Sequence, residues 1–509
     1  MVQMSRRDFV KVTGTGLALA TLPGFIRSGF AGVGAGDNPY NFYFQRFGID
    51  EDMIRKVMAE ALHYGGDYCD LFFENTLSNS ISLQDNIVNS ASTRITLGVG
   101  IRVLKGDQTG YSFTEDISLA SMKAAARTAA GIASGSPKAA PKSFNATKLM
   151  NYYNTEVSWE DVGVKDKVEM LQAINDDLFK EDPRVVKASV YFSDIEKYIL
   201  VANSEGGITT DYQPMLLLWA GCTAEENGKR ENNSFNYSVR EDTSYLTQER
   251  LKRLSKEAVS RTVNLFAAQT PSAGELPVVL AAGGAGILLH EAIGHGMEAD
   301  FNRQGISVYS EKMNKKIAED FVTIVDSGTH PNIRGSINVD DEGVPSQETV
   351  LVEDGVLRTY IHDRISAKHY GLEPTGNGRR ESFKHYPMPR MRSTYMLNGP
   401  HEFDEMIASV DYGILADQFT NGQVNIGPGD FTFYVKSGSL IENGKITAPI
   451  KDVNIIGNGP EVLGRITMVA NDMEMAEGGW TCGKNGQRVP VSQGMPSVLV
   501  SSITVGGRG

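Results

Sequence analysis

The sequence GGAGILLHEAIGHGMEAD, residues 283–300, contains two of the eight histidines of the chain, His290 and His295, with Glu291 directly after the first. An apolar run at residues 276–282 precedes it and predicts a buried strand that leads into a helix. Neutral imidazoles are common zinc ligands, and a carboxylate beside one of them can take a proton from water. The stretch therefore predicts a strand followed by a helix that could hold a metal ion.

The spacing of the two histidines leaves two interpretations open. In the common zinc motif His-Glu-x-x-His the histidines are four residues apart on one helical face. Here they are five apart, which turns the rings about 140° away from each other on a regular α-helix. Either they are two polar residues on a helix that packs through its small and apolar face, or an extra residue near Gly294 forms a π-type bulge that brings the rings together.

The composition is that of a globular protein with two or three domains. The chain has 509 residues, of which 41% are hydrophobic and 22% charged. Its 49 basic and 62 acidic residues give a net charge of −13, which argues against nucleic acid as a partner. Cys69, Cys222 and Cys482 are too few and too far apart to indicate a disulfide framework, and a metal ligand is a reasonable role for one of them.

The N-terminus resembles an export signal. SRRDFVK at residues 5–11 is followed by a weakly apolar run at residues 12–25. This order predicts a twin-arginine signal over residues 1–36 and a periplasmic or other extracytoplasmic location. The run is too short and too rich in Gly and Thr to be a clear membrane span. A cytosolic chain with a chance Arg-Arg pair and an uncleaved anchor are the alternatives.

Residues 37–270 predict an N-terminal α/β two-layer domain, so that the chain as a whole belongs to the α+β class. Amphipathic patterns predict four helices, and alternating apolar patterns predict the strands between them. The helices are expected at residues 50–63, 117–133, 164–179 and 246–267, and the strands at 68–76, 80–84, 95–104, 109–113, 185–194, 197–203, 207–223 and 233–240.

Residues 271–509 predict a mainly antiparallel β domain that carries the histidine helix. A Pro- and Gly-containing linker at residues 269–275 separates it from the first domain. The segments EDG at 353–355 and ENG at 442–444 are strong hairpin signals.

A catalytic zinc site needs a third protein ligand besides the two histidines. Glu298 and Asp300 are close in sequence, and Cys482 lies in a glycine-rich segment that would let the backbone approach an ion. The residues alone leave these candidates open. The remaining C-terminal histidines lack ligand spacing and are expected to be surface or hydrogen-bonded residues: His330, His362, His369, His385 and His401.

Several sequence blocks resemble one family. They are the histidine helix, DEGVPSQ from Asp341, PTGNGRRES at 374–382, PMPRM at 387–391, LIENGK at 440–445 and TCGKNGQ at 481–487. Together, in this order, they resemble the TldD/PmbA metallopeptidases, and more closely the TldD branch, which keeps the metal motif.

The resemblance implies a site and an activity. It implies that His290, His295 and Cys482 bind Zn²⁺ and that Glu291 is the catalytic acid/base of a metallopeptidase that acts on small or unfolded peptides. It further implies a homodimer or a heterodimer with a related subunit. Familiar members resemble cytoplasmic proteins, which conflicts with the predicted export signal.

A basic cluster lies beside the glycines at 376 and 378: Arg379, Arg380, Lys384, Arg390 and Arg392. Arg379 and Arg380 are predicted to bind the carboxylate or backbone of a peptide substrate. A solvated basic loop or salt bridges between subunits are equally compatible with the sequence.

Two other functions compete with a zinc peptidase. The first is a non-catalytic, zinc-stabilised peptide-binding subunit or chaperone-like partner. The second is a peptide-handling scaffold without metal. A purely structural zinc site usually has four protein ligands and no need of Glu291, which favours the peptidase.

Overall fold

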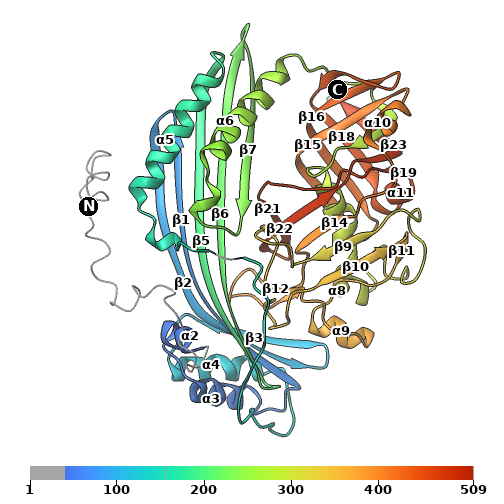
Figure 1. Ribbon diagram of the computed structural model, residues 1–509. Helices are drawn as coiled ribbons and strands as arrows, with labels where there is room; N and C mark the ends of the chain where they lie inside the picture. Colours follow the sequence, from blue (N-terminus) through green and yellow to red (C-terminus); the bar gives the residue numbers. More distant parts are fainter. Residues whose placement is uncertain (1–39, 154, 508–509) are drawn as a thin grey trace.

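A computed structural model describes residues 40–153 and 155–507 of the chain. Its elements form two parts side by side, a tall sheet of long strands with helices and a compact C-terminal part rich in strands (Figure 1). Residues 1–36, on which the export-signal prediction rests, lie outside the described residues. In the described part no helix is long and apolar enough to cross a membrane.

The N-terminal sheet has the strand order β3-β2-β1-β5-β6-β4, with β7 paired to β6. All of its pairs are antiparallel except the short parallel pair of β4 with β6. The strands are β1 (Tyr68–Gln84), β2 (Ile87–Lys105), β3 (Gln108–Thr114), β4 (Asn145–Ala146), β5 (Val185–Asn203), β6 (Gly207–Glu226) and β7 (Lys229–Val239).

Helices cover one face of this sheet at both ends. Side chains alternate between the two faces of a strand, and the odd-numbered apolar residues of β1 pack against the helices. Leu71 and Phe73 share a core with α3 and α4, while Ile81 and Leu83 share a core with α5 and α6. The helices are α2 (Asn41–Phe47), α3 (Glu51–Ala61), α4 (Leu119–Ala130), α5 (Val164–Glu181) and α6 (Gln248–Val263).

Two of the strand breaks that we predicted from the sequence are wrong. We predicted separate strands at 68–76 and 80–84, and at 185–194 and 197–203, but β1 and β5 each run through without interruption. β1 pairs with neighbours on both sides over nearly its whole length. Its backbone groups are therefore satisfied, and polar residues bond across the strands, as Asn79 does to Asp194 at 2.8 Å.

The C-terminal part contains two larger sheets and a two-stranded one. One sheet has the order β11-β10-β9-β14-β22-β20, with β21 paired to β22. Its strands are β9 (Ile324–Ser327), β10 (Glu348–Glu353), β11 (Val356–Leu357), β14 (Ser393–Met396), β20 (Glu474–Met475), β21 (Trp480–Lys484) and β22 (Gln487–Met495). The two-stranded sheet pairs β12 (Gly378–Arg379) with β13 (Met388–Pro389).

The other large sheet closes on itself, because β15 pairs with both β8 and β16 at the ends of the path β15-β8-β23-β18-β16. Its strands are β8 (Gly274–Leu280), β15 (Tyr412–Asn425), β16 (Asp430–Glu442), β17 (Lys445–Ile450), β18 (Val453–Asn458), β19 (Ile466–Val469) and β23 (Val498–Gly507). Most pairs in the C-terminal part are antiparallel; β14–β22 and β15–β8 are parallel. The chain is thus of the α+β class, as predicted.

The histidine segment leaves β8 and packs between the two large C-terminal sheets. Its apolar residues belong to one hydrophobic core with strands of both sheets. The local elements are α7 (Gly286–Leu289), η5 (His290–Gly294), η6 (His295–Met297) and α8 (Ala299–Arg303). Three further helices lie on this part of the molecule: α9 (Arg364–Tyr370), α10 (Phe403–Ala408) and α11 (Gly459–Gly464).

Candidate metal centre

The segment His290–Gly294 is a π-helical turn. The backbone N–H of His295 donates to the carbonyl of His290, five residues back, which widens the helix by one residue per turn. The two imidazole rings consequently meet with their centroids 5.1 Å apart and their planes at 81°. This confirms the prediction that a bulge near Gly294 would make the rings converge.

Glycines allow this turn to pack closely. A Cβ on Gly294 would lie 2.1 Å from Sδ of Met391, and one on Gly286 would lie 2.9 Å from the backbone nitrogen of Gly494. Both positions therefore bring the helix closer to its neighbours than a side chain would allow.

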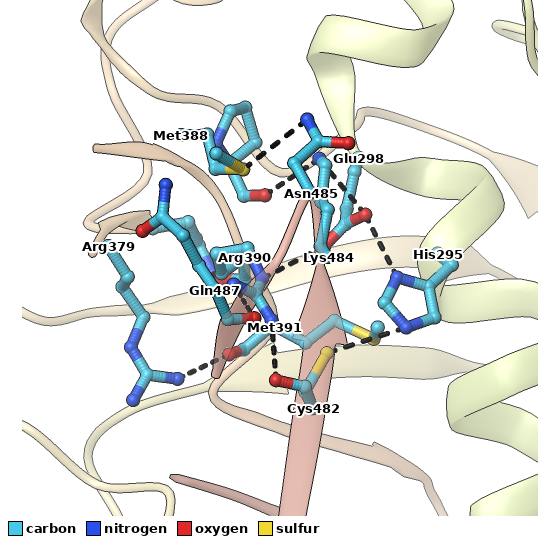
Figure 2. A network of polar contacts seen from close by, with 12 residues as sticks. His295, Glu298, Arg379, Met388, Arg390, Met391, Cys482, Lys484, Asn485 and Gln487 are labelled. Carbon is cyan, nitrogen blue, oxygen red and sulfur yellow. Dashed lines mark hydrogen bonds and ion pairs between the residues drawn. The ribbon is translucent and has the colours of Figure 1, made fainter. Parts of the chain in front are cut away.

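Cys482 lies opposite the two histidines on β21. Its Sγ faces the imidazole of His295 (Figure 2), and the distance from Sγ to Nε2 of that ring is 3.4 Å. One potential ligand atom from each of His290, His295 and Cys482 falls within 4.8 Å of the others, and within the described residues no other group of His, Cys, Asp and Glu forms such a cluster. Two segments nearly 200 residues apart in sequence thus meet at one point.

The unpaired ring nitrogens of His290 indicate that these three residues could hold a zinc ion. Both ring nitrogens of the buried His290 have no hydrogen-bond partner in the described structure. An unpaired buried polar group is costly, and an ion between the three side chains would supply the missing partner. Two imidazoles and a thiolate are soft and borderline ligands of the kind that zinc prefers.

The neighbouring histidines favour the thiolate form of Cys482 against the effect of burial. Burial by itself would raise the pKa of this thiol, but the imidazoles of His295 and His290 outweigh burial and hold the pKa well below its usual value. Burial likewise acts to lower the pKa of His295, and Glu298 and Cys482 raise it well above its usual value. The thiolate is the form of cysteine that binds metals.

Glu291 differs from the ligand cluster in its exposure. Its side chain is 22% exposed, whereas that of His295 is 5% exposed. Its Oε2 lies 3.7 Å from Nε2 of His295. The carboxylate therefore stands beside the ligand cluster and is partly accessible to solvent.

Glu298 and Asp300, the alternative third ligands, do not join the cluster. Glu298 instead lies behind His295, with its Oε2 3.0 Å from Nδ1 of the ring. Burial by itself would raise the pKa of Glu298, but Lys484 and His295 lower it to about 2, so the group is a carboxylate at neutral pH. This contact was not predicted, although a residue three positions after a helical histidine can lie on the same side.

Arg379 and Arg380 are buried, and their guanidinium groups bond to the chain itself. Arg379 donates to the carbonyls of Met391 and Pro490 at 2.6 and 2.7 Å. Arg380 donates to the carbonyl of Asp341 at 2.8 Å and lies 3.5 Å from the Asp70 carboxylate. This geometry favours a structural role, and contact of either residue with a peptide stays a prediction.

The other C-terminal histidines stand apart from the cluster. His362, for example, is buried, and burial lowers its pKa to about 4. Cys69 and Cys222 are buried free thiols. The expectation that the other C-terminal histidines lack ligand spacing agrees with the described structure.

Comparison with known proteins contradicts one prediction from the sequence. The chain matches TldD homologues, which are proteins of cytoplasmic type, and this overturns the twin-arginine signal and the periplasmic location. The prediction rested on a seven-residue motif before a weakly apolar run, and the similarity to these relatives over 87% of the chain does not support it.

Solved structures share the fold. A protein of Thermotoga maritima superposes with a TM-score of 0.73 at 24% identity, over 90% of this chain and 100% of that one. TldE from Thermococcus kodakarensis gives a TM-score of 0.69 at 21% identity, over 89% of this chain and 100% of that one. At these identities the likeness concerns the fold alone.

The amino-acid sequence of the chain is also similar to curated proteins and to family models. The metalloprotease TldD homologue of Haemophilus influenzae is 42% identical over 87% of this chain and 94% of its own length. The zinc metalloprotease TldD homologue of Saccharolobus solfataricus is 37% identical over 48% of this chain and 55% of its own length. Models of the PmbA/TldA metallopeptidase domain 1, central domain and C-terminal domain match residues 69–133, 158–266 and 273–507. The chain belongs to the PmbA/TldD family of metallopeptidases.

Proposed function

We propose that this chain is a zinc-dependent peptidase that hydrolyses peptide bonds of small or unfolded peptides. In this proposal His290, His295 and Cys482 hold the zinc ion, and Glu291 is the general acid/base. One observation carries the proposal: three buried ligand side chains converge, and a partly open carboxylate stands 3.7 Å from one of them.

A zinc ion held there would supply Lewis-acid activation of water and of the scissile carbonyl. Glu291 accepts a proton at its carboxylate from the attacking water and returns it to the nitrogen of the leaving amine. Its partial exposure at the edge of the buried ligands supports this role. Because the ligands are buried, only a short or extended peptide segment could approach them. This supports small or unfolded peptides as the substrates.

The chain's similarity to TldE supports a partner. We infer that it pairs with a second copy or with a related subunit of the same family, as the fold shared with the Thermococcus protein suggests. Light scattering on the purified chain, alone and co-expressed with a related subunit from the same genome, tests this. A monomer in both preparations would refute it.

Glu291→Gln tests the activity. Mass spectrometry of a peptide digest should show cleavage by the wild type and a loss of about 10²- to 10⁴-fold in the variant, because general acid–base catalysis contributes a factor of this order. Elemental analysis should find one equivalent of zinc in both proteins. A variant that cleaves as fast as the wild type would remove Glu291 from the mechanism.

The main alternative is a non-catalytic, zinc-stabilised peptide-binding subunit. Three protein ligands rather than four, beside an open carboxylate, argue against it, because structural zinc sites are usually closed by a fourth ligand. Zinc in the wild type together with peptide binding but no cleavage would favour this alternative.

A further inference from the structure

A buried polar network lies behind the ligands and connects the histidine helix with the Cys482 strand (Figure 2). Its centre is Glu298, whose side chain is completely buried. The side chains of Lys484 and Arg390 reach this carboxylate from other parts of the chain. None of these three residues has a role in the proposed function.

Glu298 determines which nitrogen of His295 is free. Its carboxylate oxygen is 3.0 Å from Nδ1, so Nδ1 carries the proton that the carboxylate accepts. Nε2 is then the nitrogen that gives up its proton when a metal ion binds, and it points to the side of Cys482, whose Sγ lies 3.4 Å away. A carboxylate in this position fixes both the tautomer and the ring orientation of a metal-binding histidine.

Lys484 connects Glu298 with the strand of the third ligand. It stands two residues after Cys482 on β21. Its Nζ lies 3.1 Å from Oε2 of Glu298 and donates to Asp300 at 2.7 Å and to the carbonyl of Pro389 at 3.1 Å. Its side chain is 2% exposed, so its ammonium group meets these partners and the ring of Phe301, 4.2 Å away, rather than solvent.

Arg390 makes the same connection from a third segment. Its guanidinium donates to the backbone carbonyl of Cys482 at 2.7 Å and to that of Gln487 at 3.4 Å. Its Nε is 3.9 Å from the second oxygen of Glu298. Both cations thus contact Glu298 on one side and the hairpin of Cys482 on the other.

The charges of this network balance. The carboxylates of Glu298 and Asp300 face the cations of Lys484 and Arg390, and the removal of one member would leave an opposite charge buried without its partner. Four side chains that are complementary without an ion can hold the backbone around the ligands in place before a metal arrives.

We propose that Glu298 is the positioning residue of His295, and that Lys484 and Arg390 couple it to Cys482 so that the ligands are arranged in advance for zinc. This inference rests on the zinc ligands of the proposed function. It adds that Nε2 of His295 is the ligand atom and that three residues outside the ligand set determine the affinity for zinc.

The test measures zinc affinity by competition with a chelator, without any peptide. Glu298→Gln and Lys484→Met should each weaken zinc binding about 10- to 100-fold, the usual effect of residues that orient metal ligands. Lys445→Met removes an exposed lysine of β17 and should leave the affinity unchanged. Lys484→Arg keeps the positive charge and should restore part of the affinity.

A second readout reports the ligand geometry. Cobalt(II) in place of zinc gives a thiolate charge-transfer band, and the band should be altered in Glu298→Gln, because His295 then loses its fixed orientation toward the ion that Cys482 also binds. Circular dichroism verifies that each variant is folded. If Lys484→Met alone does not fold, Glu298→Gln/Lys484→Met, which removes one charge of each sign, replaces it and should show the same weak affinity.

Unchanged affinity and an unchanged cobalt spectrum in folded Glu298→Gln and in Lys484→Met or its double replacement would overturn the inference. So would a wild-type protein without measurable zinc affinity. Failure of the proposed function looks different: the wild type would bind zinc tightly and the variants weakly, while no peptide would be cleaved.

Discussion

Two buried ionic networks in this chain contact the same C-terminal part, and only one of them borders the candidate metal centre. The interdomain network consists of Asp70, Arg102 and Glu342, all completely buried. Arg102 donates to Asp70 at 2.8 Å and lies 2.7 Å from Glu342, which joins the long sheet to the C-terminal part. The metal-side network consists of Glu298, Lys484 and Arg390.

The difference lies in what surrounds each network. Beside the metal-side network, His290 has two nitrogens without partners and Glu291 is partly open. Around the interdomain network, charges of opposite sign face each other and no cluster of ligand atoms is present among the described residues. Buried charge alone therefore does not indicate a site; convergent ligand atoms beside an accessible carboxylate do.

The largest expected effect is a loss of stability when the interdomain network is broken, with no change in zinc affinity. Arg102→Met leaves Asp70 and Glu342 buried without their shared cation, and such a break should lower the free energy of unfolding by about 3–5 kcal/mol. Chemical denaturation measures this loss, and chelator competition should find unchanged zinc affinity. Arg94→Met, on an exposed part of β2, is the control and should stay within about 0.5 kcal/mol of the wild type. A fall in zinc affinity with Arg102→Met would mean that the two networks are coupled.

A pH titration examines the interdomain contact at Asp211, which lies on β6 and accepts a hydrogen bond from Asn338 at 2.9 Å. Burial raises the pKa of Asp211 to about 6, although Tyr153, Gln213 and Asn338 donate to it. The folded state thus binds the proton more tightly than the unfolded state, whose pKa is near 3.8. The contribution of Asp211 to stability is complete below pH 4 and is lost as pH rises to about 6.

Asp211→Asn removes this titration. Relative to the wild type, the variant should gain up to about 3 kcal/mol in free energy of unfolding between pH 4 and pH 7, since each pKa unit corresponds to about 1.4 kcal/mol. Urea unfolding of both proteins at pH 4, 5, 6 and 7 gives the difference directly. A difference that is constant with pH would show that Asp211 is ionised throughout in the folded state.

The helices and strands of the N-terminal domain could largely be predicted from the sequence, because helix periodicity and alternation are local patterns. The predicted helix at 164–179 and the observed α5 at Val164–Glu181 nearly coincide. The continuity of β1 could not be predicted. Ser78 and Asn79 look like a break in the sequence, and only the pairing with β2 and β5 shows why the strand continues.

In the candidate site, too, local features could be predicted from the sequence and long-range contacts could not. His290, Glu291 and the need for a π turn follow from a few neighbouring residues. The choice between Glu298 and Cys482 does not, because Cys482 reaches the helix only through long-range pairing of β21 with β22. Arg390 belongs to a basic cluster that resembles a solvated loop, yet it is buried. Whether a charge is buried depends on partners far away in the sequence.

The smallest expected effect concerns the turn that brings the two histidines together. In Gly294→Ala the new Cβ would lie 2.1 Å from Sδ of the buried Met391. Overpacking of this kind costs about 1–3 kcal/mol, and the better helix propensity of alanine returns up to about 1 kcal/mol. We therefore expect a net loss of about 1–2 kcal/mol in stability. Zinc binding should also weaken, because Gly294 belongs to the π turn that orients His290 and His295.

Gly464→Ala is the matched control for this last change. Gly464 ends α11, and a Cβ there meets nothing within 4 Å, so this variant should be as stable as the wild type and bind zinc equally well. Chemical denaturation and chelator competition on the two alanine variants decide the matter. If Gly294→Ala matches Gly464→Ala in both, Met391 adapts freely, and its packing does not hold the π turn. A loss of zinc affinity in Gly294→Ala alone would show that the five-residue spacing binds metal only while this close contact is kept.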